Sequence, residues 1–315
     1  MGSAQVGIFY LLYDLGLGYM KRKVIQIAES TQLISLPRKW AQQYNIKKGD
    51  ELEISEQGSK LVISTGHDIG LESAKIVLTT ADKFVKRPIH NLYRRGYDEV
   101  IVEFTDSTIS SLILEQCETL LGFEIIDQSE RKVILHNVAS ALDAEFETVF
   151  RRVFLMLTSM TRDIHDAVVN KEFDRLNEIA SRERTNDKLA MFCQRLLNKR
   201  GYPDPKKLTM VYETVCQMEY IADDLRAICM LLLEVRKSSK EVELLLKLFV
   251  EIIENVHQLY FDYNIPALVK FTEKKQIVWN QAMFLLKERP VQERVIAHFV
   301  LEALNKMHHI TENIS

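Results

Sequence analysis

The C-terminal part of the chain, residues 138–315, most constrains the fold because its sequence pattern is helical nearly throughout. Apolar residues recur there three to four positions apart, which is the spacing of an amphipathic helix. Residues that end helices interrupt this pattern at Gly201-Tyr202-Pro203, Ser238-Ser239, Asn264-Ile265-Pro266 and Pro290. We therefore expect six helices, near 140–169, 172–199, 205–235, 238–262, 264–288 and 290–314.

Three long helices followed by three more indicate an internal duplication, with repeats at 138–235 and 236–315. Long helices joined by short turns pack as antiparallel neighbours. The sequence thus predicts a six-helix bundle made of two three-helix repeats.

Before the bundle, the pattern changes to short strands and helices. Residues 21–66 contain strand-like runs at 23–28 and 33–37, a short helix at 38–46 and a closing pair of strands, so we expect a small β-rich head. Residues 67–137 follow the order β-α-β-α-β-β, which favours a small ferredoxin-like α/β unit. A chain of 315 residues is long enough for this division. The expected fold class is α+β.

Residues 1–20 are apolar, contain no Lys or Arg, and are interrupted by Asp14 and the glycines after it. A signal peptide needs a basic first region, so we expect a disordered extension instead. No later stretch reaches 18 consecutive apolar residues, and membrane insertion is therefore not expected. The four cysteines form no CxxC pair, which favours buried thiols in a reducing cytoplasm.

Positive charge gathers near the start of a chain whose net charge is −3. Residues 21–48 hold seven basic residues and one acid, Glu29. Such asymmetry indicates an anionic partner, of which DNA is the commonest. The alternative is a solvated surface that happens to be basic.

The same region resembles the AbrB/SpoVT family of swapped-hairpin DNA-binding domains over residues 22–65. The resemblance rests on a strand ending at Leu36-Pro37, a short helix and the turn Gly49-Asp50-Glu51-Leu52. In that family two chains interleave into one barrel, which implies a homodimer. The resemblance also implies that five basic residues face DNA: Lys21, Arg22, Lys23, Arg38 and Lys39.

Two pairs of carboxylates are a second feature of the sequence that indicates a function. Glu183 and Asp187 lie four apart inside the apolar stripe of one predicted helix, and Glu219 and Asp223 lie four apart beside the stripe of the next. Residues four apart share a helix face, where like charges repel unless a cation joins them. Facing carboxylates on neighbouring helices are a known way to hold a metal ion. The alternative is a salt-bridge network with nearby arginines, namely Arg182, Arg184 and Arg226.

The whole 138–315 region resembles a PhoU domain, in which two three-helix repeats carry E-x-x-x-D motifs. The segments "SRERTNDKLAMFCQRLL" and "MEYIADDLRAI" carry the resemblance. It implies metal binding, with Fe, Zn, Mn or Mg as candidates, and negative regulation of phosphate uptake. The second repeat departs from the motif: Ile277 follows Glu273, and Asn305 and His309 stand where acids would fall. His308 and His309 could ligate a metal ion, but their place near the chain end favours solvent-exposed histidines.

These features together predict a cytoplasmic DNA-binding regulator of phosphate homeostasis with a metal-binding bundle. A rival interpretation is a regulator that docks on a phosphate transporter ATPase or a kinase and uses its head only to dimerise. Ala41 and Gln42 favour this rival, because better-known AbrB-type domains carry paired arginines there. A metal-storage bundle is a third possibility. The sequence contains no recognisable catalytic motif, so we expect no enzyme.

Overall fold

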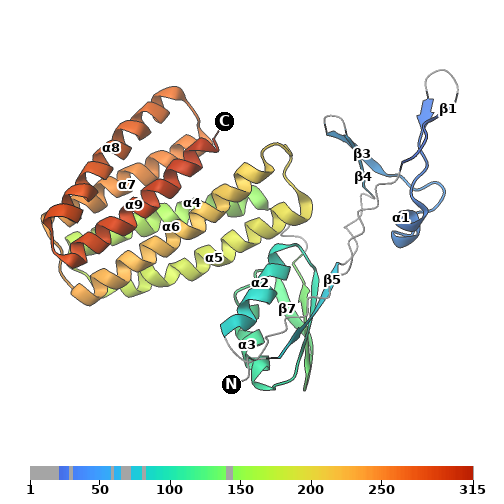
Figure 1. Cartoon of the computed structure of the whole chain (residues 1–315), viewed down its shortest axis with the longest axis horizontal. Helices are drawn as coiled ribbons and strands as arrows, with labels where there is room; N and C mark the ends of the chain where they lie inside the picture. The colour runs from blue at the N-terminus through green and yellow to red at the C-terminus, as the bar shows by residue number, and fades with distance from the viewer. Residues whose placement is uncertain are drawn as a thin grey trace, which may run out of the picture.

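A computed structural model describes residues 21–27, 31–57, 60–64, 72–79, 83–139 and 145–314. The fold is α+β, with a small strand-containing head, a middle sheet unit and a C-terminal helical bundle (Figure 1). The extension expected at residues 1–20 lies outside the described residues.

The bundle contains the six helices that the sequence predicts. They are α4 Phe146–Val169, α5 Arg175–Arg200, α6 Leu208–Val235, α7 Lys240–Phe261, α8 Ile265–Glu288 and α9 Val291–Glu312. α5 begins three residues later than expected because α4 ends in a left-handed residue, Lys171, at φ +60°. A further turn, in which Arg175 donates to the carbonyl of Glu172, then leads into α5.

Equivalent helices of the two halves meet in the bundle. α4 packs against α7 and α6 packs against α9, while α5 and α8 each pack mainly on the helices of their own half. The apolar stripes of all six helices merge into one buried core. Side-chain caps fix two of the turns, with Ser239 accepting from Val242 N and Asn264 from Ala267 N. The pairing of equivalent helices is consistent with the two three-helix repeats expected from the helix pattern, and the duplication itself stays a prediction.

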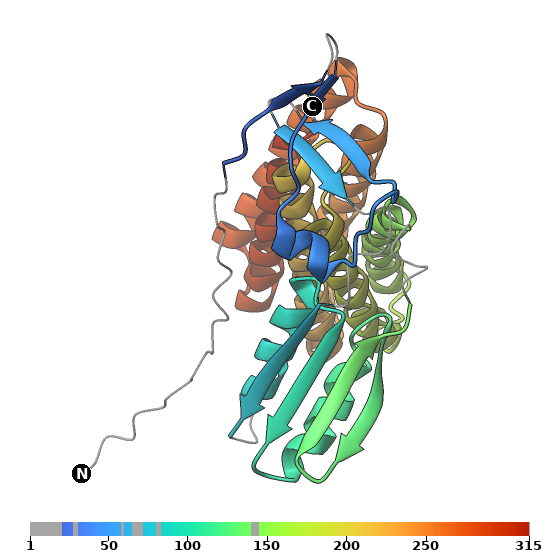
Figure 2. The ribbon, with the colours of Figure 1, turned by 90° about the vertical axis from the view of Figure 1, so that its right-hand side faces the viewer.

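The middle unit is a four-stranded sheet with the strand order β5-β6-β8-β7. Figure 2 shows the strands side by side with helices behind them. The elements are β5 Ser73–Leu78, a 3-10 turn η1 Lys83–Val85, α2 Lys86–Arg94, β6 Glu99–Phe104, α3 Thr108–Cys117, β7 Phe123–Ser129 and β8 Lys132–Asn137.

The predicted order β-α-β-α-β-β is confirmed, but the ferredoxin-like connection is wrong. β5 and β6 are parallel and directly paired, with Ala74 opposite Val100. A split β-α-β unit would leave room for another strand between them. Here β8 instead pairs antiparallel with β6 on its other side. The sequence gives element order, whereas strand neighbours depend on long-range pairing.

The middle unit and the bundle share a hydrophobic core. Met191, Phe192 and Leu196 of α5 are buried among the apolar side chains of the sheet, α2 and α3. α5 is therefore covered on two sides, by the bundle and by the middle unit.

A buried ion pair joins the two units at the same place. The Arg195 guanidinium on α5 is fully buried and donates to Asp98 Oδ1 at 2.8 Å, just before β6. It also donates to the carbonyls of Tyr93 at 3.1 Å and Tyr97 at 2.6 Å. Lys199, one turn further along α5, pairs with the same carboxylate. Asp98 is thus neutralised by charges from another unit.

Gly96 allows this close approach. Its φ of +100° is left-handed, and a Cβ added to it would lie 3.0 Å from Lys199 Cβ. Only glycine satisfies both conditions without displacing α5. The sequence marks Gly96 as the end of a helix, but not as the point where two units touch.

The head consists of two separate hairpins and a short helix. β1 Ile25–Ile27 pairs with β2 Thr31–Leu33, and β3 Glu53–Gln57 pairs with β4 Lys60–Ser64. The strand expected at 33–37 ends earlier, because Pro37 is the N-cap of α1 Arg38–Gln43. α1 is shorter than expected because a left-handed residue, Asn45, follows it at φ +51°.

We predict that Arg195→Met lowers the free energy of unfolding by about 3–5 kcal/mol, because it leaves Asp98 buried without its main partner. Urea denaturation measures the change. Arg184→Met is the matched control, since Arg184 is exposed on the same helix and should change stability by less than about 0.5 kcal/mol. Equal effects of the two substitutions would contradict the assigned role of Arg195.

Candidate functional site

The acidic site is formed by α5 and α6, which pack side by side. One oxygen from each of Glu183, Asp187 and Asp223 lies within 4.8 Å of the others. Glu183 and Asp187 are half-buried and Asp223 is exposed at the edge. The helical spacing of four places Glu183 and Asp187 on one face, and the packing of α6 brings Asp223 to them. The structure thus gathers three of the four predicted ligands.

Glu219, the fourth predicted ligand, is held by a side chain that sequence reasoning missed. Its Oε2 accepts from Gln194 Nε2 at 3.1 Å, and the same amide contacts Cys216 Sγ at 3.4 Å. Gln194 is almost fully buried. Its position seven residues after Asp187 is a two-turn spacing, which is the signal that could have placed it on the same helix face.

Burial and mutual repulsion make this site unfavourable for negative charge. Burial, followed by the nearby Glu183 and Glu219 carboxylates, raises the pKa of Asp187 from 3.8 to about 8. Burial is also the main cause that raises the pKa values of Glu219 and Asp223. Asp187 Oδ1 is buried without a hydrogen-bond partner. A bound cation would satisfy that oxygen and offset the repulsion.

The predicted arginine network accounts for little of this charge. Arg182 pairs with Asp163 and Glu178, away from the cluster. Of the three candidate arginines, Arg226 alone forms an ion pair with a cluster carboxylate, and its Nε lies 3.7 Å from Glu183 Oε2. Because Arg226 is itself exposed, that pair contributes little.

The residues present fit a hard or borderline metal ion. Carboxylate oxygens are the ligands that Mg²⁺, Mn²⁺ and iron prefer. Glu183, Asp187 and Asp223 would hold such an ion, with Glu219 next to them. A bound ion would supply positive charge to the site and draw α5 and α6 together.

The second repeat has no matching group among the residues that the structure describes. Glu273 and Asn305 are exposed, and Ile277 is half exposed to solvent. His309 pairs instead with Glu312 at 3.2 Å. His308 is only partly buried.

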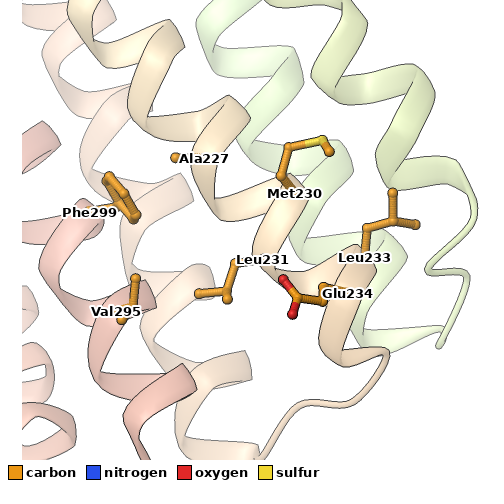
Figure 3. A pocket seen from close by; sticks show the side chains of 7 residues that line it. All are labelled: Ala227, Met230, Leu231, Leu233, Glu234, Val295 and Phe299. Atoms are coloured by element: carbon orange, nitrogen blue, oxygen red, sulfur yellow. The ribbon is translucent and has the colours of Figure 1, made fainter.

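An apolar groove lies between α6 and α9, and it is separate from the acidic site. Figure 3 shows Met230, Leu231 and Phe299 around it. Glu234 is the one acidic residue among the seven that line it. The groove therefore lacks the carboxylate set that a metal site needs.

The five basic residues of the head are all exposed: Lys21, Arg22, Lys23, Arg38 and Lys39. Lys21 to Lys23 precede β1, and Arg38 and Lys39 open α1. No carboxylate within the described ranges forms an ion pair with any of the five.

The head exposes its aliphatic side chains instead of burying them. Among its described side chains none is buried. Ile25 is 56% exposed and Ile54 is 64% exposed, although both lie in strands. A folded unit normally buries such residues. The single chain thus leaves the apolar surface of the head uncovered.

Comparison with known proteins finds a similarity for the head. Residues 25–67 match the family model described as "Antidote-toxin recognition MazE, bacterial antitoxin". The N-terminal part of the chain is therefore similar to MazE-type domains. No curated protein matched the chain.

A solved structure, the phosphate transport system regulatory protein PhoU from Streptococcus pneumoniae, is also similar to the chain. The match is 12% identical, covers 55% of this chain and 93% of that one, and has a TM-score of 0.42. Likeness at this level is too loose to transfer a function. Among the described residues, no helix is long and apolar enough to cross a membrane.

We predict that the Asp187 carboxyl makes the metal-free chain less stable as pH rises from about 4 to about 8. Its pKa is ordinarily 3.8 in the unfolded state and about 8 in the folded state, so this group binds more protons when folded and its contribution to the free energy of unfolding falls with increasing pH. Buried His90, whose pKa is lowered from 6.5 to about 4, opposes this trend below about pH 6.5. Thermal unfolding in the presence of a chelator measures the trend.

Asp187→Asn should remove this contribution, since the amide does not ionise, so the stability of the variant should fall less with increasing pH than that of the unaltered chain. Asp262→Asn serves as the control, because Asp262 is exposed at the end of α7. An unchanged pH slope in Asp187→Asn would mean that another group titrates.

Proposed function

We propose that the chain is a dimeric DNA-binding transcription regulator whose helical bundle carries a metal-binding regulatory site. The observation that supports this most strongly is the head, where a MazE-like sequence coincides with unpaired surface cations and an uncovered apolar surface. We assign no catalytic role to the chain.

Dimerisation through the head is supported by its exposed apolar residues. They are Val24, Ile25, Ile27, Leu33, Ile34, Ile54, Leu61 and Val62. A unit this small buries too little surface to be stable alone. A second copy of the head would cover these residues, as the AbrB-type resemblance implies.

DNA as the ligand is supported by the charge of the head. Lys21, Arg22 and Lys23 lie on one segment, and Arg38 and Lys39 lie on another. Two heads would present ten such cations to a duplex. Contacts of this kind go to phosphates and give affinity that depends steeply on salt.

Metal binding by the bundle is supported by the geometry of Glu183, Asp187 and Asp223. The raised pKa of Asp187 indicates that the site is electrostatically strained when it holds no cation. Phosphate status as the regulated signal is supported by the PhoU-like motifs of the sequence. The cytoplasm is the compartment that fits four free cysteines.

A second candidate function is docking on a transporter ATPase or a kinase, with the head serving only for dimerisation. The observation in its favour is α1, where Ala41 is half-buried and Gln42 exposed instead of the paired arginines of better-known AbrB-type domains. DNA binding decides between the two functions.

We predict that the full chain binds DNA from its own promoter region with an affinity that falls at least a thousandfold from 50 to 200 mM salt. Arg38→Ala/Lys39→Ala should weaken binding and reduce the salt slope by about 3 to 4, because a dimer loses four phosphate contacts. A fluorescence anisotropy titration at several salt concentrations measures both.

The control is Lys237→Ala/Lys240→Ala, which removes the same charge from exposed positions in the α6–α7 turn and at the first residue of α7. It should bind like the unaltered chain. If promoter DNA binds no tighter than an unrelated duplex, the head has the dimerisation role alone.

We predict that changing all four acids to amides, Glu183→Gln/Asp187→Asn/Glu219→Gln/Asp223→Asn, abolishes metal retention. Metal content after purification and dialysis, measured by mass spectrometry, tests this. Glu219→Gln alone should reduce retention less, because Glu219 lies outside the group of three close oxygens. Unchanged metal content in the fourfold variant would refute the site.

A further inference from the structure

Cys216 on α6 differs in chemistry from the carboxylates of the acidic site. Of the four cysteines it alone is partly exposed, whereas Cys117, Cys193 and Cys229 are buried. A partly exposed thiol can be reached from solvent, and thiolates bind soft and borderline ions such as Zn²⁺. The group of three close carboxylates offers oxygen alone. Cys216 would therefore add a ligand of a different type.

Helix packing places Cys216 next to that group but not within it. Asp187 of α5 lies beside Asp223 of α6, and Gln194 of α5 contacts Cys216. Seven residues forward on α5 thus match seven residues back on α6, as expected of antiparallel neighbours (Figure 1). Cys216 lies about 10 Å along the helix axis from Asp223, so the two cannot bind one ion. Glu219 lies between them on the same face of α6.

Gln194 joins the thiol to the nearest carboxylate. Its Nε2 lies 3.4 Å from Cys216 Sγ and donates to Glu219 Oε2 at 3.1 Å. Only 1% of Gln194 is exposed, and its Oε1 is buried without a hydrogen-bond partner. A half-turn of the amide about its last side-chain bond exchanges the nitrogen for that oxygen. The same place then offers a cation a sulfur, a carboxylate oxygen and an amide oxygen.

We propose that Cys216, Glu219 and Gln194 form a second metal position, next to the acidic site, for a borderline ion such as Zn²⁺. The inference rests on the proposed metal site and adds a position of different chemistry to it. On binding, the thiol releases its proton to water and the thiolate donates an electron pair to the ion. The ion also satisfies Gln194 Oε1. The bundle thus holds one ion on carboxylates and a softer one on sulfur.

A titration of the full chain with Co²⁺ alone, with a phosphine as the reductant, tests the proposal. A thiolate ligand gives Co²⁺ a strong charge-transfer absorption in the near ultraviolet, which carboxylate ligands do not produce. The unaltered chain should show this band. Cys216→Ser should abolish it and lower the number of bound ions by about one per chain. The matched control is Cys117→Ser, which alters a buried thiol of α3 and should keep the band.

Two further measurements separate the second position from the acidic site. Gln194→Leu removes the amide, keeps a side chain of similar size, and should weaken the Co²⁺ affinity measured from the band about tenfold. Mn²⁺ is a hard ion that prefers oxygen, so it reports on the carboxylates. Its affinity should agree to within about twofold between Cys216→Ser and the unaltered chain.

The outcomes distinguish the second position from the metal site on which it rests. A band that persists in Cys216→Ser, or Co²⁺ binding to the unaltered chain without a band, would overturn the second position alone. Equal Co²⁺ affinities of Gln194→Leu and the unaltered chain would remove Gln194 from the ligand set. If the unaltered chain binds neither Co²⁺ nor Mn²⁺, the proposed metal site and the second position both fail.

Discussion

The arrangement of the two larger units depends on the buried pair between Arg195 and Asp98. Leaving either charge buried without the other costs several kcal/mol, so the middle unit cannot leave α5 without a large loss of stability. The guanidinium also donates to two carbonyls at the end of the α2 segment. This set of bonds places α2 beside α5.

The acidic site differs from this buried ion pair, because its carboxylates lie close together with few positively charged partners. Glu183, Asp187 and Asp223 are brought together by helix packing, and the nearest arginine is an exposed one. Perturbed carboxylates of this kind are enriched at functional sites. Burial of apolar side chains in the continuous core of the bundle offsets the free energy that repulsion between these carboxylates costs.

The head differs from both larger units because none of its side chains within the described residues is buried. Its described strands expose aliphatic side chains, and its sequence is similar to MazE-type domains.

By itself, the sequence determined the six helices, the order of strands and helices along the chain in the middle unit, the basic head and the two E-x-x-x-D pairs. Each of these is a local pattern, set by residue spacing along one element. Tertiary structure alone decided that β5 pairs with β6, that Glu219 is held by Gln194, and that Arg195 joins α5 to Asp98. Those contacts join residues from 25 to 97 positions apart, and no periodicity along the chain records which distant side chains will meet.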